Sequence, residues 1–181
     1  MKIMIVYATV EGQTGKIARF VESELRTSGQ RTELLDTARR VDPVSFSGID
    51  LVVLAAPVHE RRHPQTFEIF VATHRKGMSA IPTLMISVSL SAAFPEGREA
   101  AADYLTEMSM RTGFTPDESL LCAGAVRVEN YDYFAEQVLR HVVLRGRDYD
   151  PAKGSHEFTD WTELRRVVSD FVTEEAELDL P

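Results

Sequence analysis

The first residues able to do chemistry follow an apolar run at the start of the chain. They combine two hydroxyls, a glycine and a glutamine directly before a segment with helical spacing: Thr9, Val10, Glu11, Gly12, Gln13 and Thr14. Hydroxyls and backbone N–H groups at the start of a helix bind phosphate without needing a lysine. The same residue types are also typical of a turn that caps a helix, so the pattern alone leaves both interpretations open.

The spacing in this region excludes other phosphate motifs. Gly12 lies too close to Gly15-Lys16 for a P-loop, and an isoleucine follows where that motif needs a hydroxyl. A dinucleotide fingerprint needs further glycines that the segment lacks. A phospho-acceptor receiver domain needs a carboxylate at the end of the third strand, where the chain has Ala55-Ala56-Pro57.

A second group, from Pro57 to His63, combines arginines and histidines with one glutamate. Arginine makes charge-assisted bonds to acidic groups, and histidine suits proton transfer near neutral pH. We therefore take His59, Arg61 and His63 as candidate catalytic residues; the alternative is a loop whose charges all face solvent. We expect no metal site, and we expect Cys122, in an apolar strand, to be an inert core thiol.

These groups are positioned by a regular alternation of strands and helices. Apolar runs predict strands over 3–8, 32–35, 50–56, 82–88 and 119–126. Helical periodicity predicts helices over 14–28, over 65–76, from Pro95 to a stop at Gly113, and from Asp160 onward. The alternation indicates an α/β fold with a parallel sheet and helices on both faces. Ligands of such sheets bind beyond the carboxyl ends of the strands.

Length and charge narrow the possible functions. The 181 residues fit one domain, 1–181, with an insertion over about 127–157 and a frayed acidic tail over about 174–181. The 20 basic and 28 acidic residues give a net charge of −8, which argues against nucleic-acid binding and a polybasic membrane anchor. The single cysteine cannot form an internal disulfide, which favours a reducing, cytoplasmic location.

The segment Tyr7-Ala8-Thr9-Val10-Glu11-Gly12-Gln13-Thr14 resembles the FMN-phosphate loop of flavodoxins. The glutamine before the second threonine, with the stretches 64–71, 87–90, 123–125 and 158–161, is closer to the flavodoxin-like protoporphyrinogen dehydrogenases. The resemblance implies a flavodoxin-like three-layer sandwich, a five-stranded parallel sheet of order 2-1-3-4-5, and one non-covalent FMN. It places the phosphate on Thr9 to Thr14. It places the ring between two loops, made by Pro57, Val58, His59, Glu60 and Arg61 and by Ser87, Val88, Ser89 and Leu90.

The resemblance also implies an activity. The protein would be an oxidoreductase that passes electrons from a small-molecule substrate, protoporphyrinogen, through FMN to a quinone or a protein acceptor. It would be cytoplasmic and at most peripheral to a membrane; a homodimer is left open.

The chain departs from the family at Glu60-Arg61, where related dehydrogenases have Tyr-Gly, and neither ring-side loop holds a tryptophan or tyrosine. Only His59 and His63 could stack on the ring. Two alternatives therefore stay open: a soluble electron carrier or quinone reductase, and a flavodoxin-fold binding module with weak or no FMN.

The charge of the first ring-side loop carries a further expectation. Arg61 and Arg62 are expected to crowd the edge of the ring. A cation about 6 Å from a developing negative charge contributes about 3 kcal/mol at an effective dielectric constant of about 20. We expect this charge either to stabilise a reduced, anionic flavin or to hold an acidic substrate.

Overall fold

A five-stranded parallel sheet forms the centre of the protein. The computed structural model describes residues 1–39, 44–126 and 155–178. The strands are β1 (Lys2–Tyr7), β2 (Arg31–Asp36), β3 (Leu51–Pro57), β4 (Thr83–Ser89) and β5 (Glu118–Ala123). Their order across the sheet is β2-β1-β3-β4-β5, and every pair is parallel. This confirms the predicted fold class and strand order.

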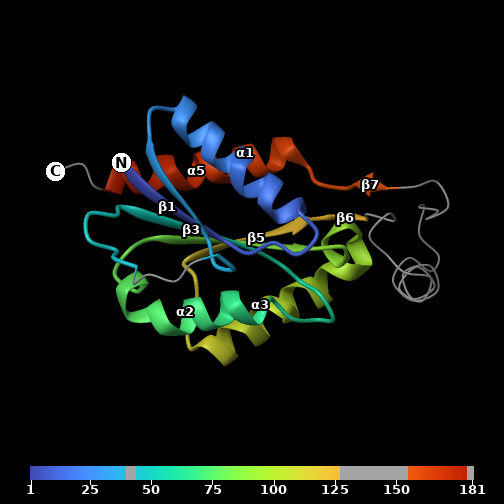
Figure 1. Cartoon of the computed structure of the whole chain (residues 1–181). Helices are drawn as coiled ribbons and strands as arrows, with labels where there is room; N and C mark the ends of the chain where they lie inside the picture. The colour runs from blue at the N-terminus through green and yellow to red at the C-terminus, as the bar shows by residue number, and fades with distance from the viewer. Residues whose placement is uncertain (40–43, 127–154, 179–181) are drawn as a thin grey trace.

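Helices cover both faces of the sheet (Figure 1). On one face lie α1 (Gln13–Thr27) and α5 (Trp161–Leu178), and on the other lie α2 (Gln65–Met78) and α3 (Arg98–Thr112). Short 3₁₀ turns, η1 (Ser91–Ala93) and η2 (Pro95–Gly97), connect β4 to α3. Every residue of β3 and β4 is buried, because helices cover both faces of these strands.

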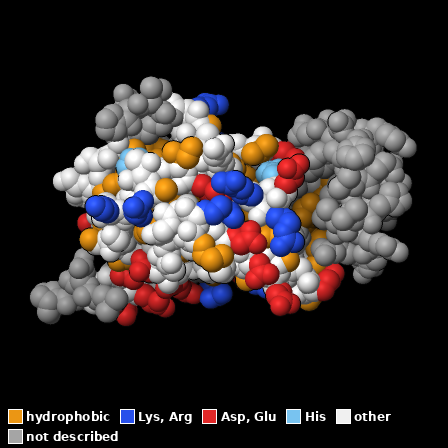
Figure 2. All heavy atoms as spheres, turned by 90° about the horizontal axis from the view of Figure 1, so that it is seen from below, with side chains coloured by type: hydrophobic (Ala, Val, Ile, Leu, Met, Phe, Trp, Pro, Cys, Tyr) orange, Lys and Arg blue, Asp and Glu red, His pale blue; other side chains and the backbone are white. Residues whose placement is uncertain are grey.

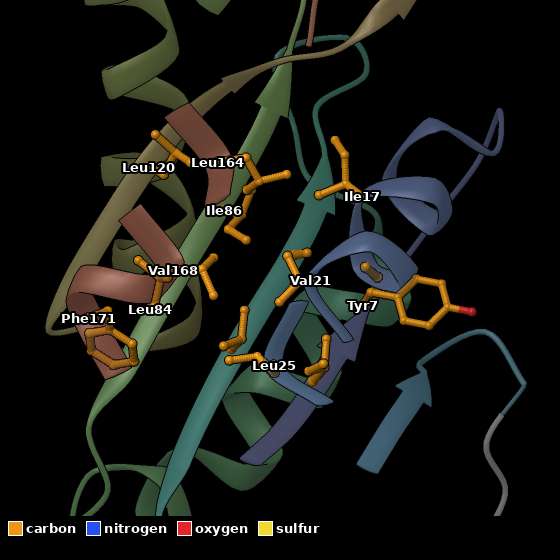
Figure 3. Packing of buried hydrophobic residues seen from close by; sticks show 14 of the residues in the cluster. Tyr7, Ile17, Val21, Leu25, Leu84, Ile86, Leu120, Leu164, Val168 and Phe171 are labelled. Atoms are coloured by element: carbon orange, nitrogen blue, oxygen red, sulfur yellow. The ribbon is translucent and has the colours of Figure 1, made fainter. Parts of the chain in front are cut away.

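Alternate side chains along the strands point to opposite faces of the sheet and form two separate cores. In β1, Ile3 and Ile5 pack under α1 and α5, whereas Met4 and Val6 belong to the core under α2 and α3. Figure 3 shows the first core, in which side chains of both covering helices point onto the sheet. The four-residue spacing predicted for α1 places Ile17, Val21 and Leu25 in this core, where α5 contributes Leu164, Val168 and Phe171.

The fifth strand is shorter than the sequence predicts. β5 ends at Ala123, and the chain then forms β6 (Ala125–Val126), which pairs antiparallel with β7 (His156–Glu157). At the break, Gly124 donates its N–H to the Ser89 carbonyl at 3.2 Å. The chain thus leaves the main sheet at Gly124. Most of the insertion expected over 127–157 lies outside the described residues.

Two predicted helix ends are wrong. Helix α2 continues through Gly77 to Met78, and the ring of Phe46 packs where a Cβ on Gly77 would lie, 3.0 Å away. The glycine therefore admits a packing contact and does not end the helix. Helix α5 runs to Leu178, so residues 174–178 are helical and are not a frayed tail. Glutamate and alanine favour helix, which allows α5 to continue past its last core residue.

The surface formed by α2 and α3 carries mixed charge. Figure 2 shows acidic and basic side chains interspersed on this face, with small apolar patches between them. Ion pairs account for part of this pattern, such as Arg111 with Glu107 at 3.3 Å. Within the described ranges, no helix is long and apolar enough to cross a membrane.

Candidate binding site at the carboxyl edge of the sheet

A cavity of about 550 Å³ opens at the carboxyl ends of β1, β3 and β4. All three predicted loops contribute to its wall, through Glu11, Gln13, Thr14, Pro57, Val58, His59, Glu60, Arg61, Val88, Ser89 and Leu90. The cavity lies where the winding of the sheet reverses between β1 and β3, the place where ligands bind in doubly wound sheets.

The loop after β1 has the geometry of an anion site. Gly12 has a φ of 91°, a left-handed conformation that glycine adopts without strain, and its N–H donates to Thr9 Oγ1 at 3.1 Å. Helix α1 begins at the next residue, so its first N–H groups, around the buried Thr14, have no acceptor within the helix. These donors and the helix dipole favour a phosphate in the bend. Val10 is 62% exposed and does not line the cavity.

Gln13 anchors this loop to the segment before α5. Its side-chain amide donates to Glu157 Oε2 at 3.0 Å and to Thr159 Oγ1 at 2.9 Å. Glu157 also accepts from Lys16 Nζ at 2.7 Å and from Trp161 Nε1 at 2.8 Å. Burial raises the pKa of Glu157, but these hydrogen bonds outweigh burial and leave the pKa below its ordinary value. The carboxylate therefore stays ionised and ties the phosphate loop to β7.

The loop after β3 forms a tight hairpin. His59 and Arg62 exchange two backbone hydrogen bonds, each of 2.9 Å. The two residues between them, Glu60 and Arg61, have φ values of 48° and 65°, as a two-residue hairpin turn with positive φ at both positions requires. The turn places the guanidinium of Arg61 over the ring of Tyr104 in α3, 5.4 Å from the ring centroid.

Arg62 faces away from the cavity, which contradicts the expectation that it crowds a ring edge. Its guanidinium donates to Glu68 Oε2 from Nε at 3.1 Å and from Nη2 at 2.8 Å. Glu68, only 5% exposed, also accepts from Arg111 Nη2 at 2.8 Å. Burial raises the pKa of Glu68, but the hydrogen bonds from Arg111 and Arg62 outweigh it and lower the pKa. A buried carboxylate needs such partners, and it draws Arg62 towards α2 and α3.

His63 is also outside the cavity. Its ring is 1% exposed, and Nε2 lies 3.0 Å from the buried Ser87 hydroxyl. Burial lowers the pKa of His63 to about 4. The ring is therefore neutral at physiological pH, and the expectation that it could stack on a ligand in the cavity is wrong. Cys122, as expected, is a buried thiol, and burial raises its pKa to about 12.

The predicted basic loop does not make the cavity basic. Arg61 lines it, but so do Glu11, Glu60 and Glu96. With Arg62 turned to Glu68 and His63 neutral, the cluster of like charges expected from the sequence is divided between the cavity and the helices behind it.

Sequence reasoning missed the contribution of η2 and α3. Glu96, Gly97, Ala100 and Tyr104 line the cavity, together with Ser91, Gly124 and Ala125. Gly97 is needed because a Cβ there would lie 2.3 Å from the Ser91 carbonyl oxygen. Tyr104, at 9% exposure, also belongs to the core. The available signal was Pro95, which starts η2, the turn that leads into α3 and lines the cavity with Glu96 and Gly97.

Fold, cavity and phosphate loop together define a class of protein. A flavodoxin domain family model matches residues 4–151, and the chain belongs to this family. Two solved structures share the fold: oxidised flavodoxin 1 from Bacillus cereus (TM-score 0.53, 17% identity, 96% of this chain and 98% of that one) and a short-chain flavodoxin associated with a bacterial microcompartment (TM-score 0.59, 13% identity, 97% and 99%).

Curated relatives narrow the resemblance to one branch. The protoporphyrinogen IX dehydrogenase [quinone] of Escherichia coli K12 is 28% identical over 180 residues, covering 98% of this chain and 96% of the relative. A protein of the same name from Leishmania major is 24% identical over 173 residues, covering 94% and 74%. The sequence pattern at Gln13 and in the stretches 64–71, 87–90, 123–125 and 158–161 indicated the protoporphyrinogen dehydrogenase branch. These near-full-length relatives carry the name of that branch.

Proposed function

We propose that the protein binds one FMN non-covalently and acts as a protoporphyrinogen IX dehydrogenase with a quinone as electron acceptor. The observation that carries this proposal is the cavity of about 550 Å³, in which an anion-binding bend and two further loops meet at one edge of the sheet. The relatives with this activity in their names align over nearly the whole chain, which supports the same reaction here.

The described residues fit FMN. The bend from Thr9 to Thr14 would hold the phosphate, since its glycine conformation and the start of α1 direct N–H groups into it. The hairpin from Pro57 to Arg61 and the loop from Val88 to Leu90 would border the ring. Tyr104 of α3 adds a tyrosine to the cavity wall, with Arg61 over its ring. When bound, FMN would supply the redox chemistry: it would accept an electron pair from the substrate and pass it to a quinone, three times for each protoporphyrinogen converted to porphyrin.

The chain's own residues have simpler tasks in this reaction. Of the three catalytic candidates, His59 and Arg61 line the cavity and His63 does not. His59 is exposed and lies at the cavity wall, so its ring can carry a proton from the substrate to solvent. Apolar groups such as Val58, Val88 and Leu90 exclude water from the wall and provide a surface for a planar ligand.

The test begins with the purified protein. We expect it to carry the visible absorbance of oxidised flavin and to release FMN on denaturation. We expect Thr14→Val to weaken FMN about tenfold, since one hydrogen bond to a charged group is lost. Thr27→Val is the matched control at the other end of α1, and it should bind FMN as the unaltered protein does.

Activity separates the remaining candidates. Loaded protein should convert protoporphyrinogen to fluorescent porphyrin when a soluble quinone is supplied under anaerobic conditions, and should rescue a strain lacking its own enzyme. Bound FMN without this activity would identify an electron carrier or a quinone reductase. A colourless protein that takes up no FMN would identify a binding module and overturn the proposal.

A further inference from the structure

We propose that Arg61 binds a carboxylate of the substrate, with the ring of Tyr104 as the platform that holds its guanidinium in place. This inference rests on the proposed function, because it assigns a recognition residue within the same cavity. The substrate class is a ring-shaped molecule with an ionised carboxylate at its edge, as the propionate arms of a porphyrinogen provide.

Arg61 is the arginine of the hairpin whose charge remains available. Its neighbour Arg62 is taken by Glu68 at 2.8 Å, and Lys16, at the phosphate loop, is taken by Glu157 at 2.7 Å. Among the residues that the structure describes, Arg61 makes no ion pair with a carboxylate, although it lines the cavity. A guanidinium in a cavity wall, without a carboxylate of its own, matches an acidic ligand.

The contact with Tyr104 leaves the useful donors free. The guanidinium carbon lies 5.4 Å from the ring centroid, a distance typical of a cation–π contact. The guanidinium makes no hydrogen bond to another side chain in the described parts of the chain, so its N–H donors are available to a ligand. Two parallel N–H groups of a guanidinium match the two oxygens of a carboxylate, a geometry that lysine cannot reproduce.

The backbone of the hairpin is strained where this side chain is presented. Glu60 and Arg61 both have positive φ, which is costly for residues with a Cβ and clusters at functional sites. The base of the hairpin is held by the backbone bonds of Arg62 and by its ion pair with Glu68. Glu68 also binds Arg111, on the helix that carries the tyrosine platform. One buried carboxylate thus anchors both halves of the Arg61 site.

Glu60 precedes Arg61 in the turn and also lines the cavity, but the two side chains form no ion pair in the described parts of the chain. A carboxylate that enters the cavity beside the hairpin therefore meets Arg61 as its cationic partner.

Binding of the product porphyrin tests the proposal without requiring turnover. FMN-loaded protein is titrated with protoporphyrin IX and with its dimethyl ester in the same detergent, and porphyrin fluorescence gives both dissociation constants. Arg61→Gln should weaken the diacid about ten- to a hundredfold and leave the ester unchanged, since only the diacid offers a charge-assisted contact. Arg61→Lys should recover part of the affinity. Arg166→Gln, the same charge change on the far face of α5, should behave as the unaltered protein.

The alternatives give different results. Equal weakening of diacid and ester would show that Arg61 only supports the fold of the hairpin, and unchanged binding of both would show that it does not touch the ligand. A changed midpoint potential of the bound FMN with an unchanged diacid-to-ester ratio would assign Arg61 to the flavin. Each of these results overturns the inference while leaving the proposed function intact. An unaltered protein that binds neither FMN nor porphyrin would overturn both.

Discussion

Protonation of His63 is predicted to destabilise the fold in mildly acidic solution. The ring is buried against Phe67 and Ser87, and no described group contacts its Nδ1. Burial lowers its pKa to about 4; the nearby charge of Glu68 opposes this shift and that of Arg111 adds to it. In the unfolded chain the pKa returns to about 6.5.

The sign and size of the effect follow from these two values. Between about pH 6.5 and about pH 4 the unfolded chain binds more protons at His63 than the folded protein, so the free energy of unfolding falls as the pH falls. The loss is about 2 kcal/mol at about pH 5 and approaches about 3 kcal/mol below about pH 4. Above about pH 6.5 the ring is neutral in both states and contributes no pH dependence.

Urea unfolding of the unaltered protein and of His63→Gln, each at about pH 7.5 and about pH 5, measures this loss. Glutamine keeps a polar contact with Ser87 and does not titrate. The unaltered protein should therefore lose about 2 kcal/mol more than the variant between the two pH values. Other titrating groups, including Glu68, are common to both proteins and cancel in the difference.

His59→Gln removes an exposed ring from the same hairpin and is the control for losing a histidine. Parallel pH profiles for His63→Gln and the unaltered protein would refute the reasoning.

Two further substitutions test contacts around the cavity. Gly97→Ala should lower the free energy of unfolding by about 1–3 kcal/mol, because the new Cβ would lie 2.3 Å from the Ser91 carbonyl oxygen; an unchanged urea midpoint would contradict that contact. Glu157→Gln should lower the free energy of unfolding by about 1–2 kcal/mol, because a neutral amide cannot pair with the charge of Lys16. Asp170→Asn, the control at an exposed ion pair, should lower it by less than about 0.5 kcal/mol. Equal losses in the two variants would show that the position of Glu157 is unimportant.

Local patterns predicted most of the secondary structure and the first part of the site. The bend from Thr9 to Thr14 was predictable because its chemistry lies within six consecutive residues, and a left-handed Gly12 with a helix directly behind it needs no distant partner. The helix ends at Gly77 and in the acidic tail were mispredicted for a related reason. Gly77 stays helical, and the ring that packs where its Cβ would lie comes from Phe46, far away in sequence.

The direction of side chains in the second loop could not be predicted in the same way. Arg61, Arg62 and His63 are consecutive, yet one faces the cavity, one pairs with Glu68 and one is buried beside Ser87. A tight turn with positive φ at two positions sends neighbouring side chains in different directions, and the partners that select each direction lie on other elements. The charge of a segment therefore does not give the charge of the cavity that it borders.

The amino-acid sequence by itself determined the alternation of strands and helices, the parallel sheet and the bend from Thr9 to Thr14, and it indicated the branch in which the relatives are found. These depend on periodicity and on short motifs, which report local backbone preferences and burial. Only the tertiary structure decided which charges reach the cavity, that Tyr104 joins its wall, and that Gln13 is tied to Glu157 across 144 positions of the chain. Such contacts join elements that are distant in sequence, and their geometry is set by how the helices pack on the two faces of the sheet.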